Sequence, residues 1–351
     1  MKRYGNIFNK MCSMKNIEIA HENAMRGKTH YRDVKIVNAN RSRCLGEIRN
    51  QMINKTFKTA PYVELRKNEY GKERVIHKLP YFPDRIVHHA IVQAVGHIWN
   101  QTLIRDTYAC IKGRGIHDGA NRVKSALRDV SGTKYCLKMD VSKFYQSMDH
   151  AILKSIIRRK IKDPDVLWLI DEIIDSVDAG VGIPIGNYLS QFFGNLYLSG
   201  YDHFMKEVNG CRYYFRYCDD VVILDGYKAR LHKLREFTAM SWRNELKLTL
   251  KSNWQVFPVG SRGIDFLGYR FFHHYTLLRK SITKKFKRRM LKIKRGWKYM
   301  KPPSIASSIS SYNGWLVHAD CHNLSKQHID SEILSIRDNA LNEMKLKGKA
   351  A

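Results

Sequence analysis

The chain has 351 residues, enough for one large domain or two to three packed subdomains with a hydrophobic core. Lys and Arg number 62 against 32 Asp and Glu, and the formal net charge of +30 indicates a polyanionic partner. No run of about 18 apolar residues and no secretory apolar segment occurs, which excludes a membrane span and predicts a cytoplasmic protein.

The basic residues extend along the chain and alternate with aromatic residues that can stack on bases. This pattern favours nucleic acid over the alternative of a merely basic, soluble surface. The seven cysteines are scattered without a C-x-x-C pair, so we expect neither a disulfide framework nor a zinc site.

The first regular pattern in chain order is the helix RIVHHAIVQAVGHIW (85–99), whose apolar residues share one face. We place His88 and His89 on its flank rather than at a metal. KYCLKMD (134–140) alternates as a half-buried strand and ends on Asp140. Asp149 and Asp163 are each expected to cap a helix, the second before Pro164.

Residues 188–205 predict one long buried helix, and CRYYFRY (211–217) with VVIL (221–224) predicts a hairpin that carries Asp219 and Asp220 at its tip. A helix follows, with Tyr227, Leu231, Leu234 and Phe237 on one face. Residues 247–260 and 263–272 then predict a strand pair. This order of elements favours an α+β fold built on an antiparallel sheet.

Asp140 at a strand end and Asp219 in a hairpin turn become neighbours if their strands lie in one sheet. Two carboxylates on adjacent strands can hold a pair of Mg²⁺ ions roughly 4 Å apart, the arrangement used for in-line phosphoryl transfer. Taken singly, an Asp-Asp pair in a loop is more often a solvated turn. The two sites together, in so basic a chain, favour nucleotidyl transfer.

Five segments resemble the palm motifs of reverse transcriptases in order and spacing: DVSKFYQSMDH (140–150), GIPIGNYLSQ (182–191), YCDDVV (217–222), NELKLTLKSN (244–253) and GIDFLGYRFF (263–272). KERVIHKLPYFPDRIVHHAI (72–91) and TYACIKGRGIHDGA (107–120) are similar to finger motifs of the bacterial and group II intron branch. The resemblance implies a right-hand polymerase with fingers in residues 1–133, a palm in 134–272 that includes a fingers-associated segment near 163–200, and a thumb in 273–351.

The resemblance assigns roles to the catalytic residues. Asp140, Asp219 and Asp220 match the metal-binding aspartates, and the carbonyl of Val141 completes a shell for two Mg²⁺ ions, with Mn²⁺ as a substitute. Lys251 matches the lysine that protonates the pyrophosphate leaving group. Lys247, one turn away, is the alternative for this role.

Further roles concern the substrates. The residues that match the site for the incoming dNTP are Lys72, Arg74, Arg114, Phe144, Tyr145, Ile185 and Gly186. Tyr145 matches the side chain that blocks a 2′-hydroxyl, with a core aromatic beside Phe144 as the alternative. Phe266, Leu267, Gly268 and Tyr269 resemble the primer grip, although an ordinary amphipathic strand has the same pattern.

Most reverse transcriptases have Gln-Gly and Ser-Pro in the motif that GIPIGNYLSQ matches, whereas this chain has Ile185-Gly186 and Ser190-Gln191. That variation resembles the enzymes of diversity-generating retroelements, which copy a template-repeat RNA into cDNA with errors opposite adenine. The resemblance implies mutagenic retrohoming of the cDNA into a variable repeat. It also implies partners: template RNA, the cDNA/RNA hybrid, dNTPs and a small basic accessory protein in a ring oligomer.

About 80 residues follow FLGYRFF, enough for a thumb but too few for a ribonuclease H or endonuclease domain. One alternative is a reverse transcriptase of a retron, of phage defence or of a group II intron. The other is a catalytically inactive RNA-binding scaffold, which the presence of Asp140, Asp219, Asp220 and Tyr145 disfavours.

Overall fold

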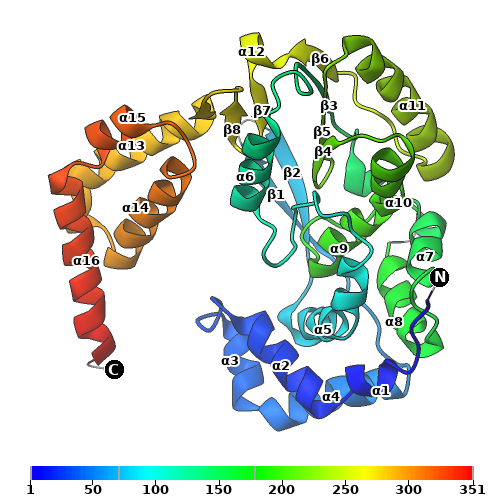
Figure 1. The fold of residues 1–351 in the computed structure, drawn as a ribbon. Coiled ribbons are helices and arrows are strands. Elements are labelled where there is room, and N and C mark those ends of the chain that lie inside the picture. The colour runs from blue at the N-terminus through cyan, green and yellow to red at the C-terminus, as the bar shows by residue number, and fades with distance from the viewer. Residues whose placement is uncertain (1, 70–71, 178, 350–351) are drawn as a thin grey trace. The chain divides into compact units, whose positions relative to one another are not determined.

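The computed structural model describes residues 2–69, 72–177 and 179–349 (Figure 1). The chain divides into two compact units. Unit 1 comprises Met1–Ile111, Met139–Val221 and Lys233–Trp254, and unit 2 comprises Lys112–Lys138, Val222–His232 and Gln255–Ala351. Each unit is therefore assembled from three stretches that lie far apart in the sequence.

Unit 1 is mainly helical. Its first stretch contains α1 (Phe8–Met11), α2 (Met14–Met25), α3 (Arg32–Ala39), α4 (Arg41–Ile53), the hairpin of β1 (Val63–Glu69) and β2 (Lys72–Lys78), η1 (Tyr81–Arg85) and α5 (Ile86–Asn100). Its later stretches contain η2 (Phe144–Ser147), α7 (His150–Arg158), α8 (Pro164–Ile174), α9 (Tyr188–Tyr197), α10 (Ser199–His203), η3 (Phe204–Val208), β4 (Tyr213–Tyr217) and most of α11 (Lys228–Leu246).

The predicted helix starts in this unit are confirmed. Asp149 accepts a hydrogen bond from the backbone N of Ile152 and so caps α7. Asp163 accepts from Asp165 N and Val166 N at the start of α8, where Pro164 occupies the first turn. The side chain satisfies N–H groups that otherwise have no partner within the helix.

A four-stranded sheet has the order β4-β5-β3-β6, with β3 at Tyr135–Met139, β5 at Asp220–Asp225 and β6 at Gln255–Pro258. β3 and β6 are antiparallel. Val221, Val222, Ile223 and Leu224 are all buried along β5, as expected for a central strand that is covered on both faces. The hairpin expected from residues 211–224 is therefore confirmed as β4 and β5.

Unit 2 contains α6 (Ile116–Ala126), α12 (Val259–Arg262), an antiparallel sheet of β7 (Ile264–Phe266), β8 (Tyr269–Phe271) and β9 (Thr276–Leu278), and the helices α13 (Lys280–Gly296), η4 (Trp297–Tyr299), α14 (Pro302–Leu316), α15 (His322–His328) and α16 (Ser331–Lys349). A tight turn of Leu267 (φ 53°) and Gly268 (φ 85°) joins β7 to β8. A Cβ at Gly268 would lie 2.6 Å from the Trp315 ring, so only glycine fits there.

Two expectations about regular elements are wrong. Residues 247–260 and 263–272 do not pair with each other, because β6 pairs with β3 while β7 pairs with β8. The helix expected over 188–205 is interrupted at Leu198, where α9 ends and α10 begins. Periodicity predicts which segments are extended or helical, but it does not specify the partner of a strand.

Two expectations about side chains are also wrong. We placed His88 and His89 on the flank of their helix, but both are buried in α5, and burial lowers the pKa of His88 to about 3. His89 stacks on Tyr188 with ring centroids 4.1 Å apart. Tyr227 precedes α11 and is 77% exposed, while Leu231 and Leu234 of the same predicted face are buried.

Candidate active site

The two predicted catalytic aspartates lie together in unit 1. Asp140 directly follows β3, and Asp219 lies in the turn between β4 and β5, which are strands of the same sheet. The two carboxyl groups lie close enough to interact, and burial together with the charge of Asp140 raises the pKa of Asp219 to about 7. Asp220 follows Asp219 in the sequence, is the first residue of β5 and is half-buried. The carboxylates therefore repel each other unless a proton or a cation intervenes.

Lys251 contacts this pair directly. Its Nζ donates to Asp140 Oδ2 at 2.9 Å, and its backbone N donates to the Asp140 carbonyl at 2.9 Å. A β-bridge between Val141 and Leu250 aligns the two segments. Lys247 instead binds Asp149 at 2.5 Å, so the geometry separates the two lysines that the sequence left open.

Tyr145 lies against the turn that carries Asp219. Its hydroxyl hydrogen-bonds with Cys218 Sγ at 3.1 Å, and Cys218 has a left-handed backbone with φ 56°. A Cβ at Gly194 would lie 3.3 Å from the Tyr145 ring, so this glycine gives the ring its space. Phe144 is buried, whereas Tyr145 is partly exposed. The neighbouring aromatics thus have different environments, and Phe144 is the core residue.

Ile185 and Gly186 lie against β2. The backbone N of His77 donates to the Ile185 carbonyl at 2.7 Å, and a Cβ at Gly186 would lie 2.9 Å from the His77 carbonyl. Gly186 has φ 112°, which also requires glycine. The backbone of this motif is therefore fixed, and the partly exposed Ile185 side chain adds an apolar surface. Lys72 and Arg74 belong to β2, but their side chains lie outside the described ones.

The remaining predicted residues belong to unit 2. Arg114 precedes α6 and is half-buried. Phe266, Leu267, Gly268 and Tyr269 are buried, and the Tyr269 hydroxyl donates to the Trp315 carbonyl at 3.2 Å. The ring centroids of Tyr269 and Trp315 lie 5.2 Å apart, so the β7-β8 turn packs against α14 in this unit. The primer-grip role remains a prediction.

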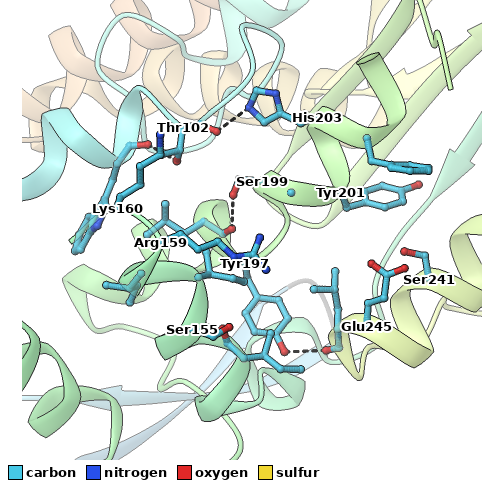
Figure 2. A pocket seen from close by; sticks show the side chains of 18 of the residues that line it. Thr102, Ser155, Arg159, Lys160, Tyr197, Ser199, Tyr201, His203, Ser241 and Glu245 are labelled. Carbon is cyan, nitrogen blue, oxygen red and sulfur yellow. Dashed lines mark hydrogen bonds between the residues drawn. The ribbon is translucent and has the colours of Figure 1, made fainter. Parts of the chain in front are cut away.

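A cavity of about 660 Å³ in unit 1 contains none of the predicted site residues. It lies among the end of α5, α7, α9, α10 and α11, and Figure 2 shows Arg159, Tyr197 and Glu245 around it. The Tyr197 hydroxyl donates to the Leu246 carbonyl at 2.8 Å on its wall. We assign it no part in the chemistry at Asp140 and Asp219.

Residues 65–271 match the family model described as reverse transcriptase (RNA-dependent DNA polymerase). This range holds the aspartate pair, Lys251 and Tyr145. The chain belongs to the reverse transcriptase family. Protein YkfC of Escherichia coli (strain K12) is 26% identical to the chain over 234 residues, which cover 55% of this chain. The match spans 61% of the length of that relative.

A similar solved structure shows the fold. Telomerase from Candida tropicalis, in complex with a fragment of telomeric RNA, has a TM-score of 0.50 at 13% identity, covering 85% of this chain and 56% of that chain. Telomerase from Candida albicans has a TM-score of 0.46 at 12% identity, covering 68% of this chain and 51% of that chain. The fold is the α+β right-hand polymerase fold. Among the described residues, no helix is long and apolar enough to cross a membrane.

The sequence did not point to two residues beside the turn that carries Asp219. Cys218 contacts Tyr145 through its thiol, and Arg216 donates to the Cys218 carbonyl at 2.8 Å. The one available signal for Arg216 was a charged residue inside the alternating strand CRYYFRY, between Phe215 and Tyr217.

Proposed function

We propose that the chain is an RNA-directed DNA polymerase of a diversity-generating retroelement, which copies a template-repeat RNA into error-prone cDNA. The observation that carries the polymerase activity is the contact between Asp140 and Asp219, with Lys251 on the same carboxylate. The motif IGNYLSQ (185–191) supports the retroelement class, because its Ile185 and Gln191 depart from the usual glutamine and proline.

The donor set fits divalent cations with a preference for oxygen. Asp140 and Asp219 supply carboxylate oxygens in contact, and the Val141 carbonyl and Asp220 lie next to them in the chain. Burial and the charge of Asp140 raise the pKa of Asp219, and a cation bound between the two carboxylates would offset this repulsion. Within the described residues, no group of three or more His, Cys, Asp or Glu side chains could hold a metal ion by itself. Two Mg²⁺ ions bound here would neutralise phosphate charge and activate the primer 3′-hydroxyl.

Lys251 is the residue that we propose as general acid for the pyrophosphate leaving group. Its hydrogen bond and ion pair with Asp140 raise its pKa, so the side chain keeps its proton at neutral pH. A proton donor at this position assists departure of the leaving group as the new phosphodiester bond forms.

Tyr145 is proposed to exclude ribonucleotides. Its ring rests on Gly194 and its hydroxyl on Cys218, next to Asp219, so that the ring is fixed beside the catalytic turn. A rigid aromatic side chain at this place leaves no room for a 2′-hydroxyl. The product is then DNA.

Ile185 is proposed to lower fidelity. A glutamine there can hydrogen-bond to the incoming nucleotide or the template, and one such bond contributes on the order of 1 kcal/mol. Isoleucine offers only an apolar contact, and since about 1.4 kcal/mol is tenfold in a rate ratio, discrimination falls several-fold. The proposed partners are template-repeat RNA and dNTPs, whose negative charge agrees with the net charge of +30, and also a small basic accessory protein in a ring oligomer.

Primer extension on an RNA template with dNTPs and Mg²⁺ tests the polymerase activity. We expect extension by the wild type and none by Asp219→Ala, with RNA binding retained because the basic surface is unchanged. Asp225→Asn is the matched control, since Asp225 ends β5, the strand that follows Asp219, and pairs with Arg230. Extension by Asp219→Ala would remove the aspartate pair from the proposed site, and an inert wild type that binds RNA would indicate a scaffold.

The retroelement class needs its own experiment. Sequencing of cDNA made by the wild type and by Ile185→Gln on one RNA should show errors concentrated opposite adenine, and a lower adenine error fraction in the variant. A uniform error spectrum in the wild type would assign the chain to another class of bacterial reverse transcriptase. An adenine bias that Ile185→Gln leaves unchanged would place the selectivity elsewhere in the pocket.

A further inference from the structure

A completely buried ion pair lies next to the catalytic turn in unit 1. The side chains of Arg216 on β4 and Asp202 on α10 are both 0% exposed. Arg216 Nε donates to Asp202 Oδ1 at 2.8 Å, and Nη2 donates to Oδ2 at 2.5 Å. The Tyr214 hydroxyl donates to Asp202 Oδ1 at 2.6 Å. This geometry is bidentate, which only arginine can provide.

The other guanidinium hydrogens reach the backbone around the active site. Nη2 donates to the Asn195 carbonyl of α9 at 3.1 Å, and Nη1 donates to the carbonyl of Cys218 at 2.8 Å. Nη1 also lies 3.5 Å from Asn195 Oδ1. Because a guanidinium has five N–H donors, every donor direction of Arg216 is used. One side chain thus connects α9 and α10 to the turn that bears Asp219.

The turn itself is a demanding one. Cys218 adopts φ 56°, a left-handed conformation that L-residues other than glycine rarely occupy, and Asp219 follows it immediately. A residue in this region persists only where its surroundings hold it. The hydrogen bond from Arg216 to the Cys218 carbonyl provides such a constraint at the peptide that joins Cys218 to Asp219.

Stability alone does not account for the pair. Removing two charges from water costs several kcal/mol per ion, and apolar residues of similar volume are often as stable or more stable. We propose that Arg216, oriented by Asp202, is a positioning residue that fixes the Cys218-Asp219 turn so that Asp219 meets Asp140. The expected loss of kcat rests on the proposed function, whereas the fixed position of the Cys218-Asp219 turn can be tested without any activity.

The first test is Arg216→Lys with Tyr214→Phe as matched control. Lysine keeps the charge opposite Asp202 but cannot bond Asp202, Asn195 and Cys218 together. Because misplacement by about 1 Å costs on the order of 100-fold, we expect kcat for dNTP addition to fall by about that factor while KM for dNTP changes little. Tyr214→Phe removes a buried hydrogen bond to the same Asp202 and no bond to the turn, so it should retain the wild-type kcat.

A second variant separates positioning from folding. The triple substitution Arg216→Met, Asp202→Leu and Tyr214→Phe removes both buried charges together, so that neither is left unpaired, and it removes the bond to Cys218. We expect a melting temperature near that of the wild type and the same loss in kcat as Arg216→Lys. If the network served only stability, this folded variant would keep full kcat.

The accessibility of the Cys218 thiol reports on the turn without any catalysis. Iodoacetamide labelling, quantified by peptide mass spectrometry, should modify Cys218 faster in the triple variant than in the wild type, while the buried Cys12 and Cys211 stay protected in both. Equal Cys218 labelling, or wild-type kcat in the folded triple variant, would overturn the positioning role. An inactive wild type with faster Cys218 labelling in the variant would refute the proposed function alone.

Discussion

Replacing Asp219 with Asn is expected to abolish catalysis and, without metal, to stabilise the folded chain at alkaline pH. The wild-type side chain has a pKa raised from 3.8 to about 7 by burial and by the charge of Asp140. A carboxyl whose pKa is higher in the folded than in the unfolded chain makes the fold lose stability as pH rises between these two values. Asparagine carries no charge and therefore avoids this loss.

The magnitude follows from the two pKa values. Moving a pKa from 3.8 to about 7 corresponds to about 4 kcal/mol above pH 7, where the folded chain must hold the charge. At pH 5 the same linkage amounts to less than about 2 kcal/mol, because the folded carboxyl is then still protonated. The advantage of Asp219→Asn should therefore grow by about 3 kcal/mol from pH 5 to pH 8.

Urea unfolding of both proteins in EDTA at pH 5 and pH 8 measures this difference, since groups shared by the two chains cancel. Adding Mg²⁺ at pH 8 should stabilise the wild type more than the variant, because the variant has lost one of the three carboxylates proposed to bind the metal. The same advantage at both pH values, or a less stable variant at pH 8, would show that Asp140 and Asp219 do not repel each other in the fold.

Three further outcomes are expected. Tyr145→Ala should lower the preference for dNTP over rNTP, measured as the ratio of kcat/KM values, on the order of tenfold or more. Tyr145→Phe loses only the bond to Cys218 and should keep this preference. An unchanged ratio in the alanine variant would leave Tyr145 a packing role. Lys251→Met should slow single-turnover nucleotide addition about 100-fold, and equal slowing by Lys247→Met would contradict the assignment of the acid. Asp163→Ala should lower the free energy of unfolding by about 2 kcal/mol, because Asp163 caps α8 and accepts from the backbone of residues 7 and 8. Burial alone would raise the pKa of Asp163, but these N–H donors bring it below the usual value, so the loss should persist down to about pH 4 and vanish in stronger acid.

The part of the fold that carries Asp140 and Asp219 was predictable because its sequence signals are local. An aspartate that closes an alternating strand, as at Asp140, and two more at a hairpin tip mark strand ends in the sequence itself. The caps at Asp149 and Asp163 are equally local, since each bonds to backbone within three residues. The contact between Asp140 and Asp219 then required one further condition, that β3 and β5 lie side by side.

Long-range pairing was not predictable in the same way. β6 pairs with β3, so that Gln255 lies opposite Lys138, and no local pattern distinguishes this partner from β7 nearby in the chain. The same limit applies to His88, since an imidazole is common on solvated helix faces and only the surrounding helices make it buried. Periodicity describes the faces of one element, whereas burial depends on what covers them.

Arg216 shows how this limit conceals functional residues. In CRYYFRY an arginine among apolar neighbours indicates an outward-facing strand position, because an arginine is almost never fully buried unless it is paired. Its ion-pair partner Asp202 lies in helix α10, and the Cys218 carbonyl to which it donates lies in the turn after β4. A charge held at 0% exposure requires every donor to be satisfied, so its surroundings must be as exact as those of a ligand site. A substitution at such a buried charge can therefore change the catalytic rate, even though the residue lies far from the substrate.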